Sequence, residues 1–198
     1  MQMIDENFKD HKQNALKKLK SALENRQVDS LIIDLLHKIN SQEEYFTTSS
    51  CAGRIVVLQL PKIGDKKHAV FLGRWHRQVT RDEVFSALNS FDEGQIWLLT
   101  QPPIFHIGCK DLEAANRLMK TGISTGFKHS GIRSLSGQII VELQSTERMD
   151  MPMGQKGKRI VADDIIPFLV ETANTAIRRA QEKLNRLEEA IEKGVHKN

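Results

Sequence analysis

Residues 45–54, YFTTSSCAGR, gather the side chains of this sequence that are best suited to holding a ligand. Four consecutive hydroxyl side chains are followed by the thiol of Cys51, and then by Gly53 and Arg54. Hydroxyls donate and accept hydrogen bonds, glycine lets the backbone approach a bound group, and a guanidinium offers a fixed fork to a carboxylate or phosphate. The stretch leads into a strand-like apolar run, residues 55–60. We predict a ligand-holding loop here, and a Ser/Thr-rich turn before a strand is the structural alternative.

Other candidate site residues stand at or near the ends of predicted elements, where functional groups are usually placed on a rigid scaffold. They are Trp75 and His76 at the end of a strand, His106 within the strand-like run IFHIG, the Gly-punctuated segment 126–133, Met151 and Pro152, and the basic loop 155–159. Composition and spacing therefore indicate a polar, partly basic cleft.

Two kinds of chemistry compete for these residues. A metal site could use histidine and cysteine ligands, but no pair among them has the i, i+4 spacing of a helical site or the close spacing of a zinc motif, so we predict no metal. A cysteine hydrolase could use Cys51 as nucleophile with His76 or His106 as base. A lone histidine in an alternating strand is more often structural. The candidate metal ligands are His76, His106, Cys51 and Cys109.

The composition is that of a globular chain that is long enough to bury a core. With 198 residues and 39% hydrophobic content we expect a single domain over residues 1–198. The net charge of +4 permits a nucleic-acid partner. No run of about 18 apolar residues and no signal-peptide core are present, so we expect a cytoplasmic protein that is not membrane-bound and keeps its two cysteines reduced.

The hydrophobic periodicity predicts the order of helices and strands. Ser30 is expected to cap a second helix whose buried face includes Leu31, and Thr80 is expected to cap another. The predicted elements are helices over 8–23, 30–40, 80–91 and 111–123, and strands over 55–60, 69–72, 95–99, 104–108 and 137–143. This order predicts an α+β fold with helices packed on a mixed or antiparallel sheet, and not a doubly wound parallel sheet. The glycine fingerprint GxGxxG is also absent.

A long helix is predicted from residue 162 to residue 198, with Pro167 tolerated in its first turn. Its apolar residues step alternately by four and three, which is a heptad seam. We expect the long first helix to cover this seam, and a homodimeric coiled coil is the alternative. The chain then divides into a helical segment 1–40, an α+β core 45–161 and the helix 162–198.

Five motifs in order resemble the wybutosine-synthesising methyltransferase family, the third protein of the tRNA wybutosine pathway. They are YFTTSSCAGR at 45–54, His76, PxIxHIxC at 102–109, GFKHSGI at 126–132 and MPMGQKGKRIV at 151–161. The chain departs from the family's pattern at four positions. These are Phe71, where the family has Trp, Gln101, where it has an acidic residue, and Lys128 and His129, where it has Arg and Asn.

The resemblance implies an S-adenosylmethionine-dependent methyltransferase with an unusual α+β fold. Its implied substrate is a ring nitrogen (N4) of the tricyclic, guanosine-derived base beside the anticodon of tRNA-Phe. A non-catalytic RNA-binding module is the alternative. The implied catalytic residues are His76, His106 and Ser50, and the implied cofactor ligands are Ser49, Gly53, Arg54, Ser130 and Gly131. The implied substrate contacts are Trp75, Lys128, Arg133, Lys156, Lys158 and Arg159, and Phe127 is a second candidate for stacking that we expect in the core.

Overall fold

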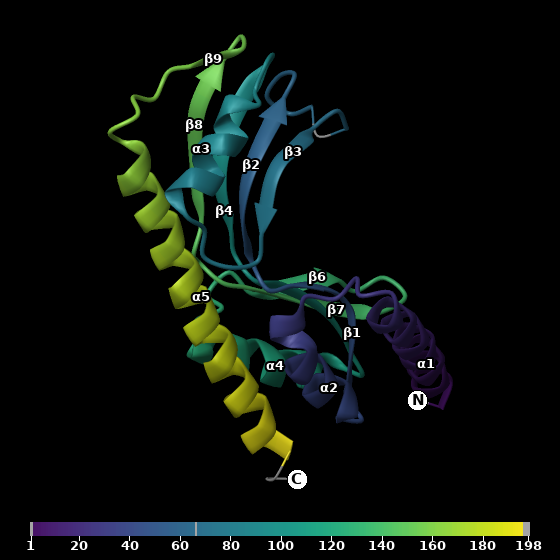
Figure 1. Cartoon of the computed structure of the whole chain (residues 1–198). Coiled ribbons are helices and arrows are strands. Elements are labelled where there is room, and N and C mark those ends of the chain that lie inside the picture. Colours follow the sequence, from purple (N-terminus) through teal and green to yellow (C-terminus); the bar gives the residue numbers. More distant parts are fainter. Residues whose placement is uncertain (1, 66, 196–198) are drawn as a thin grey trace. The chain divides into compact units, whose positions relative to one another are not determined.

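The computed structural model describes residues 2–65 and 67–195 and shows an α+β fold with antiparallel sheets (Figure 1). Its α-helices are α1 (Gln2–Glu24), α2 (Ile33–Ser41), α3 (Arg81–Asn89), α4 (Leu112–Thr125) and α5 (Ile166–Val195), and a 3-10 turn spans Ser30–Ile32. Its strands are β1 (Tyr45–Cys51), β2 (Arg54–Leu60), β3 (Val70–Trp75), β4 (Gln95–Gln101), β5 (Ile104–Cys109), β6 (Gly131–Ser134), β7 (Ile139–Gln144), β8 (Met149–Gln155) and β9 (Lys158–Arg159). The predicted fold class is confirmed.

The chain forms two compact units that are interleaved in sequence. Unit 1 comprises Met1–Ala52, Pro103–Thr146 and Gln181–Asn198, and unit 2 comprises Gly53–Pro102 and Glu147–Ala180. The first part of α5 thus belongs to unit 2 and its second part to unit 1. The single domain over residues 1–198 stays a prediction.

Unit 1 is built on a four-stranded antiparallel sheet in the order β1-β5-β7-β6. Alternate residues of each strand point to opposite faces, so Phe105 and Ile107 on β5 and Val141 and Leu143 on β7 enter one core. Side chains from α2, α4 and the second part of α5 fill the same core. The residues between them, including His106, therefore lie on the opposite face of the sheet.

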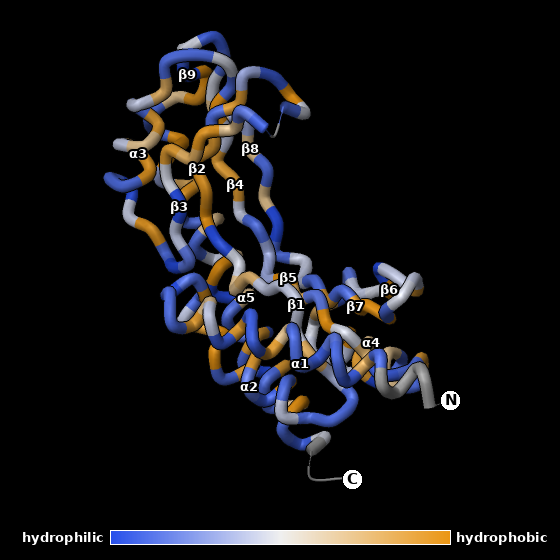
Figure 2. Tube along the Cα trace, turned by 90° about the vertical axis from the view of Figure 1, so that its right-hand side faces the viewer, coloured by the Kyte–Doolittle hydropathy of each residue, from blue (hydrophilic) through white to orange (hydrophobic). Residues whose placement is uncertain are grey.

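Unit 2 is built on a five-stranded antiparallel sheet in the order β3-β2-β4-β8-β9. Its core joins apolar side chains of β2, β4 and β8 to α3 and to the first part of α5. Hydrophobic stretches run along β2 and β4 (Figure 2). The predicted hairpin of β2 and β3 is confirmed, because the two strands pair antiparallel from Ile55 opposite Trp75 to Gln59 opposite Val70.

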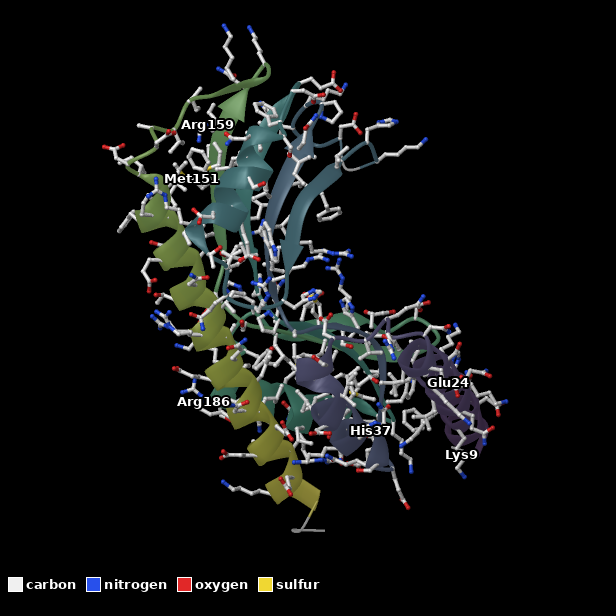
Figure 3. The ribbon with its side chains drawn as sticks, viewed as in Figure 1. Lys9, Glu24, His37, Met151, Arg159 and Arg186 are labelled. Atoms are coloured by element: carbon white, nitrogen blue, oxygen red, sulfur yellow. The ribbon has the colours of Figure 1, made fainter. Side chains whose placement is uncertain are left out.

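Helix α1 packs against β1 within unit 1, and Lys9 and Glu24 lie on this helix (Figure 3). The rings of Phe8 and Phe46 have centroids 5.3 Å apart, and Leu19 packs against the core of the unit. The ring of Phe46 lies over Gly108, where a Cβ atom would be 2.3 Å from the ring, so this position needs glycine. Phe46 pairs with Gly108 in the sheet, which places α1 on the face of the sheet that bears His106.

Two details of the predicted helices are wrong. Ser30 does not cap an α-helix, because it is the first residue of the 3-10 turn that precedes α2. Leu31 is 51% exposed, since the tighter turn rotates it away from the face that buries Ile32. The remaining predicted face of this segment is confirmed, because Leu35, Leu36 and Ile39 are buried.

The terminal helix begins at Ile166, four residues after the predicted start, and Pro167 lies in its first turn as expected. Its heptad residues are buried within the single chain. Ala173 and Ile177 lie in the core of unit 2, and Leu184, Leu187 and Ile191 lie in the core of unit 1. A homodimer through this helix stays a prediction. Among the described residues, none of the helices combines the length and apolar character that crossing a membrane requires.

Candidate functional site

Three polar side chains form a hydrogen-bonded row across the sheet of unit 1. Ser49 Oγ lies 2.7 Å from His106 Nδ1, and His106 Nε2 lies 2.8 Å from Glu142 Oε2. The three residues stand directly opposite one another in register, Ser49 with His106 and His106 with Glu142. The row is accessible to solvent at one end, because Ser49 is exposed while His106 and Glu142 are half-buried. Two predicted site residues, Ser49 and His106, are thus in direct contact.

A β-bulge produces this alignment. The pairing of β1 with β5 shifts between Thr47 and Ser49, so Thr48 is the extra residue of the bulged strand. Without the extra residue, Thr48 would stand opposite His106. Instead, Thr48 Oγ1 donates a hydrogen bond to the backbone carbonyl of His106 at 3.1 Å, and Ser49 takes the position that reaches the imidazole. Two of the hydroxyls therefore hold one histidine, one by its backbone and one by its ring.

A cavity of about 410 Å³ lies beside this row, between α1 and β1. Its β1 wall carries the hydroxyls of Thr48, Ser49 and Ser50. The opposite wall, on α1 and the turn after it, combines apolar side chains with polar and basic ones. These residues are His11, Asn14, Ala15, Lys18, Leu19, Ala22, Gln27 and Val28. A cavity of this volume with a few placed polar groups is typical of a small-ligand site.

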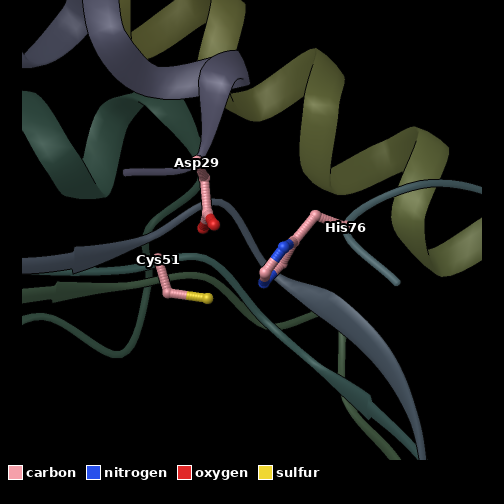
Figure 4. Close-up of side chains that lie close together, drawn as sticks. All are labelled: Asp29, Cys51 and His76. Atoms are coloured by element: carbon pink, nitrogen blue, oxygen red, sulfur yellow. The ribbon is translucent and has the colours of Figure 1, made fainter. Parts of the chain in front are cut away.

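The end of β1 is held by an acidic side chain from the segment before α2. The Asp29 carboxylate accepts a hydrogen bond from the backbone N–H of Ala52 at 2.8 Å. A carboxylate oxygen of Asp29 and Sγ of Cys51 lie within 4.8 Å of each other, and both side chains are half-buried (Figure 4). Asp29 therefore fixes the backbone at the point where the polar stretch ends.

Arg54 opens β2 in unit 2 and is held on two sides. Its Nε–H donates to Gln101 Oε1 at 2.5 Å, and its guanidinium carbon lies 5.5 Å from the centroid of the Phe71 ring. Gly53, just before it, has φ of +85°, a left-handed conformation that favours glycine. Gln101 and Phe71 are both positions at which the chain departs from the family's pattern, and both contact the same arginine.

Trp75 and His76 follow one another at the end of β3, and both are half-buried. The Trp75 ring lies across Gly73, where a Cβ atom would be 2.0 Å from the ring. It packs on the core of unit 2 and also lines an open depression of about 540 Å³ whose wall includes Asp82 and Glu83. One face of the ring is thus used in packing.

The segment GFKHSGI joins α4 to β6 in unit 1. Phe127 is fully buried, with its ring centroid 6.0 Å from that of Phe105, which confirms the expectation of core packing. Ser130 Oγ donates to the backbone carbonyl of Phe127 at 2.5 Å. Lys128 is exposed, and Arg133 Nε lies 4.0 Å from Glu142 Oε2. Arg133 therefore extends the row of polar side chains to a fourth strand, although its own side chain is 71% exposed.

The basic loop forms the turn between β8 and β9 in unit 2. Lys156 has φ of +53°, an uncommon conformation for a residue with a side chain, and it is exposed like Lys158. Arg159, labelled in Figure 3, differs from them. Its guanidinium forms an ion pair with Asp163 at 2.5 Å, and its guanidinium carbon lies 4.7 Å from the centroid of the Phe85 ring. The two lysines project from one turn, whereas the arginine also holds the chain that leads to α5.

Sequence reasoning missed Glu142 and the roles of Gln101 and Asp29. Glu142 lies within the predicted strand 137–143, and its alternation with Val141 and Leu143 already places it on the polar face. Strand order cannot be read from the sequence, so the pairing of Glu142 with His106 could not be predicted.

Cys109, one of the possible metal ligands, is fully buried, and its burial raises the pKa of its thiol to about 12. It stays in the thiol form rather than the thiolate that binds metals.

Comparison with known families and proteins gives one consistent result. The family described as methyltransferase TYW3 matches residues 10–193. A curated Pyrococcus abyssi protein named tRNA(Phe) 7-((3-amino-3-carboxypropyl)-4-demethylwyosine(37)-N(4))-methyltransferase 1 is 49% identical over 94% of this chain and 97% of its own length. A Methanocaldococcus jannaschii protein has the same name without the final numeral 1. It is 38% identical over 92% of this chain and 97% of its own length.

Two solved structures share the fold. The PH1069 protein from Pyrococcus horikoshii aligns with a TM-score of 0.92 and 48% identity, covering 95% of this chain and 97% of that one. A hypothetical protein from Aeropyrum pernix aligns with a TM-score of 0.73 and 28% identity, covering 83% of this chain and 98% of that one. The similarity extends over nearly the whole chain in each of these comparisons except the last.

Proposed function

This chain belongs to the methyltransferase TYW3 family, and we propose that it methylates a ring nitrogen, N4, of the tricyclic demethylwyosine-type base beside the anticodon of tRNA-Phe. The observation that carries the proposal is the match across residues 10–193, together with relatives of 49% identity whose names state this reaction. The relatives are covered almost completely, so the likeness includes every motif of the candidate site. We also propose that the activity is cytoplasmic.

We propose S-adenosylmethionine as the methyl donor. When bound, it supplies a sulfonium-linked methyl group, so the protein needs no nucleophile of its own and contributes orientation and electrostatic fit. Arg54 fits the donor's carboxylate, because Gln101 and Phe71 already fix the guanidinium in place. Gly53, Ser130 and Gly131 are the further candidates for binding the donor.

The tRNA side of the proposal rests on the exposed basic residues. Lys128, Lys156 and Lys158 are exposed and suit phosphate groups, as does the largely exposed side chain of Arg133. Arg159 contributes through the loop it anchors to Asp163. Trp75 is the candidate for stacking on the base through the face of its ring that is not packed on Gly73.

Three side chains are proposed to act at the reacting base. His76 and His106 are the candidates for handling the ring proton, because a neutral imidazole accepts a proton through one ring nitrogen and donates through the other. Ser50 lines the cavity of unit 1 and can hold a polar group of the base.

The test is methyl transfer to two tRNA-Phe samples. One sample carries the demethylwyosine-type base at the position beside the anticodon, and the other carries unmodified guanosine there. With S-adenosylmethionine we expect a mass gain of one methyl group on the tricyclic nucleoside of the first sample and none in the second. Methylation of both samples would assign a different substrate. Absence of methylation in both, for protein that is folded and binds tRNA, would favour the RNA-binding alternative.

A further inference from the structure

The row formed by Ser49, His106 and Glu142 has a defined direction for hydrogen bonding. An ionised carboxylate only accepts hydrogen bonds, so His106 Nε2–H is the donor in the 2.8 Å bond to Glu142. A neutral imidazole then has its lone pair on Nδ1. That nitrogen accepts the O–H of Ser49 in the 2.7 Å bond. The oxygen of Ser49, at the accessible end of the row, keeps its own lone pairs for a ligand.

The proposed methylation needs an acceptor of this kind. When a neutral ring nitrogen takes a methyl group, an N–C bond forms and the carbon–sulfur bond of the donor breaks, with the electron pair remaining on sulfur as a thioether. The ring is left cationic unless an N–H proton leaves. A positioned acceptor that removes the proton as the bond forms contributes about 10²–10⁴ in rate to reactions of this class.

We propose that Ser49 Oγ accepts the proton released by the base and passes its own proton to His106 Nδ1, while Glu142 is the positioning residue that holds the imidazole. This inference rests on the proposed function, and it assigns to Ser49 a role different from the cofactor contact that the resemblance implies. The step leaves an imidazolium whose two N–H groups donate to Ser49 and to Glu142. The proton is later lost to solvent.

The surroundings of Ser49 suit a heterocyclic base. Ser49 lines the cavity of about 410 Å³, whose apolar members Ala15, Leu19 and Val28 offer surface for a flat ring. His11 and Lys18 are the titratable groups of α1 on this cavity, and Arg133 is the charged group beside Glu142. Arg133 is 71% exposed, so its attraction to the carboxylate is screened. Thr48 holds the backbone of His106, which leaves its ring to the relay.

The same three residue types form the nucleophilic triad of hydrolases, in which serine attacks an acyl carbon. Here the electrophilic methyl group belongs to the donor, and what the substrate must lose is a proton. The serine therefore needs to be a base in hydrogen-bond reach of the ring and need not form a covalent bond.

The first test determines which ring nitrogen of His106 is protonated, and it does not depend on methyltransferase activity. In the full-length protein labelled with ¹⁵N-histidine, two-bond proton–nitrogen correlations report which ring nitrogen of His106 carries the proton. We expect the Nε2–H form in the wild type and loss of that preference in Glu142→Leu. An Nδ1–H form in the wild type would overturn the proposal, because Nδ1 could then accept nothing from Ser49.

The second test measures methylation of the tRNA that carries the tricyclic base. We expect kcat to fall about 100-fold in Ser49→Ala, with KM for tRNA unchanged, and to recover largely in Ser49→Thr, which keeps the hydroxyl. In Glu142→Gln we expect a fall of about 10-fold, because an amide can donate as well as accept a hydrogen bond and so no longer fixes the imidazole in the Nε2–H form.

Glu44→Gln is the matched control, since it removes a carboxylate of unit 1 that pairs with Arg117 rather than with His106. Its kcat should equal that of the wild type. Wild-type kcat in both Ser49→Ala and Glu142→Gln would overturn the relay while leaving the proposed function intact. An inactive wild type that shows the Nε2–H form would instead overturn the proposed function, so the two failures are distinguishable.

Discussion

Arg54 shows how a few contacts fix one functional side chain. Its Nε–H donates to Gln101 Oε1 and its guanidinium carbon lies over the Phe71 ring, so the guanidinium is oriented before any ligand arrives. Arg74 lies over the same ring, 5.6 Å from its centroid. Because the Arg54 side chain is already ordered, it loses less conformational entropy when it binds a carboxylate. A lysine at position 54 would keep the charge but lose the planar fork.

Arg54→Lys should weaken binding of S-adenosylmethionine because a bidentate contact to the donor's carboxylate becomes a single one. We expect Kd to rise about tenfold, which corresponds to roughly 1.4 kcal/mol. Calorimetric titration without RNA measures this change. Arg74→Lys is the matched control, and its Kd should stay at the wild-type value. Equal Kd values for wild type and Arg54→Lys would show that Arg54 does not bind the donor.

At the scale of single elements, the helices and most strands follow from hydrophobic periodicity, whereas strand order does not. Thr80, predicted as a cap, forms a full capping box with Glu83, and Asp111 caps α4 one residue before its first turn. The prediction that Ser30 caps an α-helix is wrong because residues 30–32 form a 3-10 turn. Over only three residues, the apolar pattern of a 3-10 turn cannot be distinguished from that of an α-helix. Glu142 could be placed on a face but not opposite His106, because register and pairing depend on the whole sheet.

The capping box of α3 should be measurable as stability. Thr80→Ala removes the side chain that accepts from the Glu83 N–H at 3.2 Å, so we expect the free energy of unfolding to fall by about 1 kcal/mol in urea denaturation. Thr172→Ala on the exposed face of α5 is the control, and it should change the free energy of unfolding by less than about 0.5 kcal/mol. An equal loss in both variants would show that the cap is not responsible.

The capping box of α3 also predicts that the free energy of unfolding depends on pH. The Arg77 guanidinium, and then the backbone N–H of Thr80, lower the pKa of Glu83 from 4.5 to about 2. A depressed folded-state pKa gives stability that is present above pH 4.5 and is lost as the pH falls toward 2. The difference in free energy of unfolding between wild type and Glu83→Gln should therefore be largest near pH 7 and shrink below pH 4.5. A constant difference would contradict this assignment.

At the scale of the whole molecule, the net charge of +4 gives no location for an RNA partner, but the exposed side chains do. Lys156 and Lys158 project from one turn of unit 2, and Lys128 is exposed on unit 1. The composition could not distinguish these lysines from those of α1, since a solvated helix face carries the same residue types. The structure shows that Lys156, with φ of +53°, and Lys158 are both exposed at one turn between β8 and β9.

Removing both lysines of this turn should reduce the salt dependence of tRNA binding. Each phosphate contact on a duplex contributes about 0.9 to the slope of log Kd against log salt concentration. We expect Lys156→Ala with Lys158→Ala to lower that slope by nearly twice this amount while kcat at saturating tRNA stays unchanged. Lys193→Ala, which breaks an exposed pair with Glu189, is the control and should keep the wild-type slope. An unchanged slope in the double variant would exclude this turn from the RNA contact.

The interleaving of the two units constrains the order in which the chain can fold as it is made. Unit 1 begins with residues synthesised first, yet its core also needs Leu184, Leu187 and Ile191, which are synthesised after every strand of both units. Unit 2 needs only residues 53–102 and 147–180, so its core does not depend on the last turns of α5. The row that begins at Ser49 on β1 therefore depends, for the core that supports its sheet, on side chains made more than a hundred residues later.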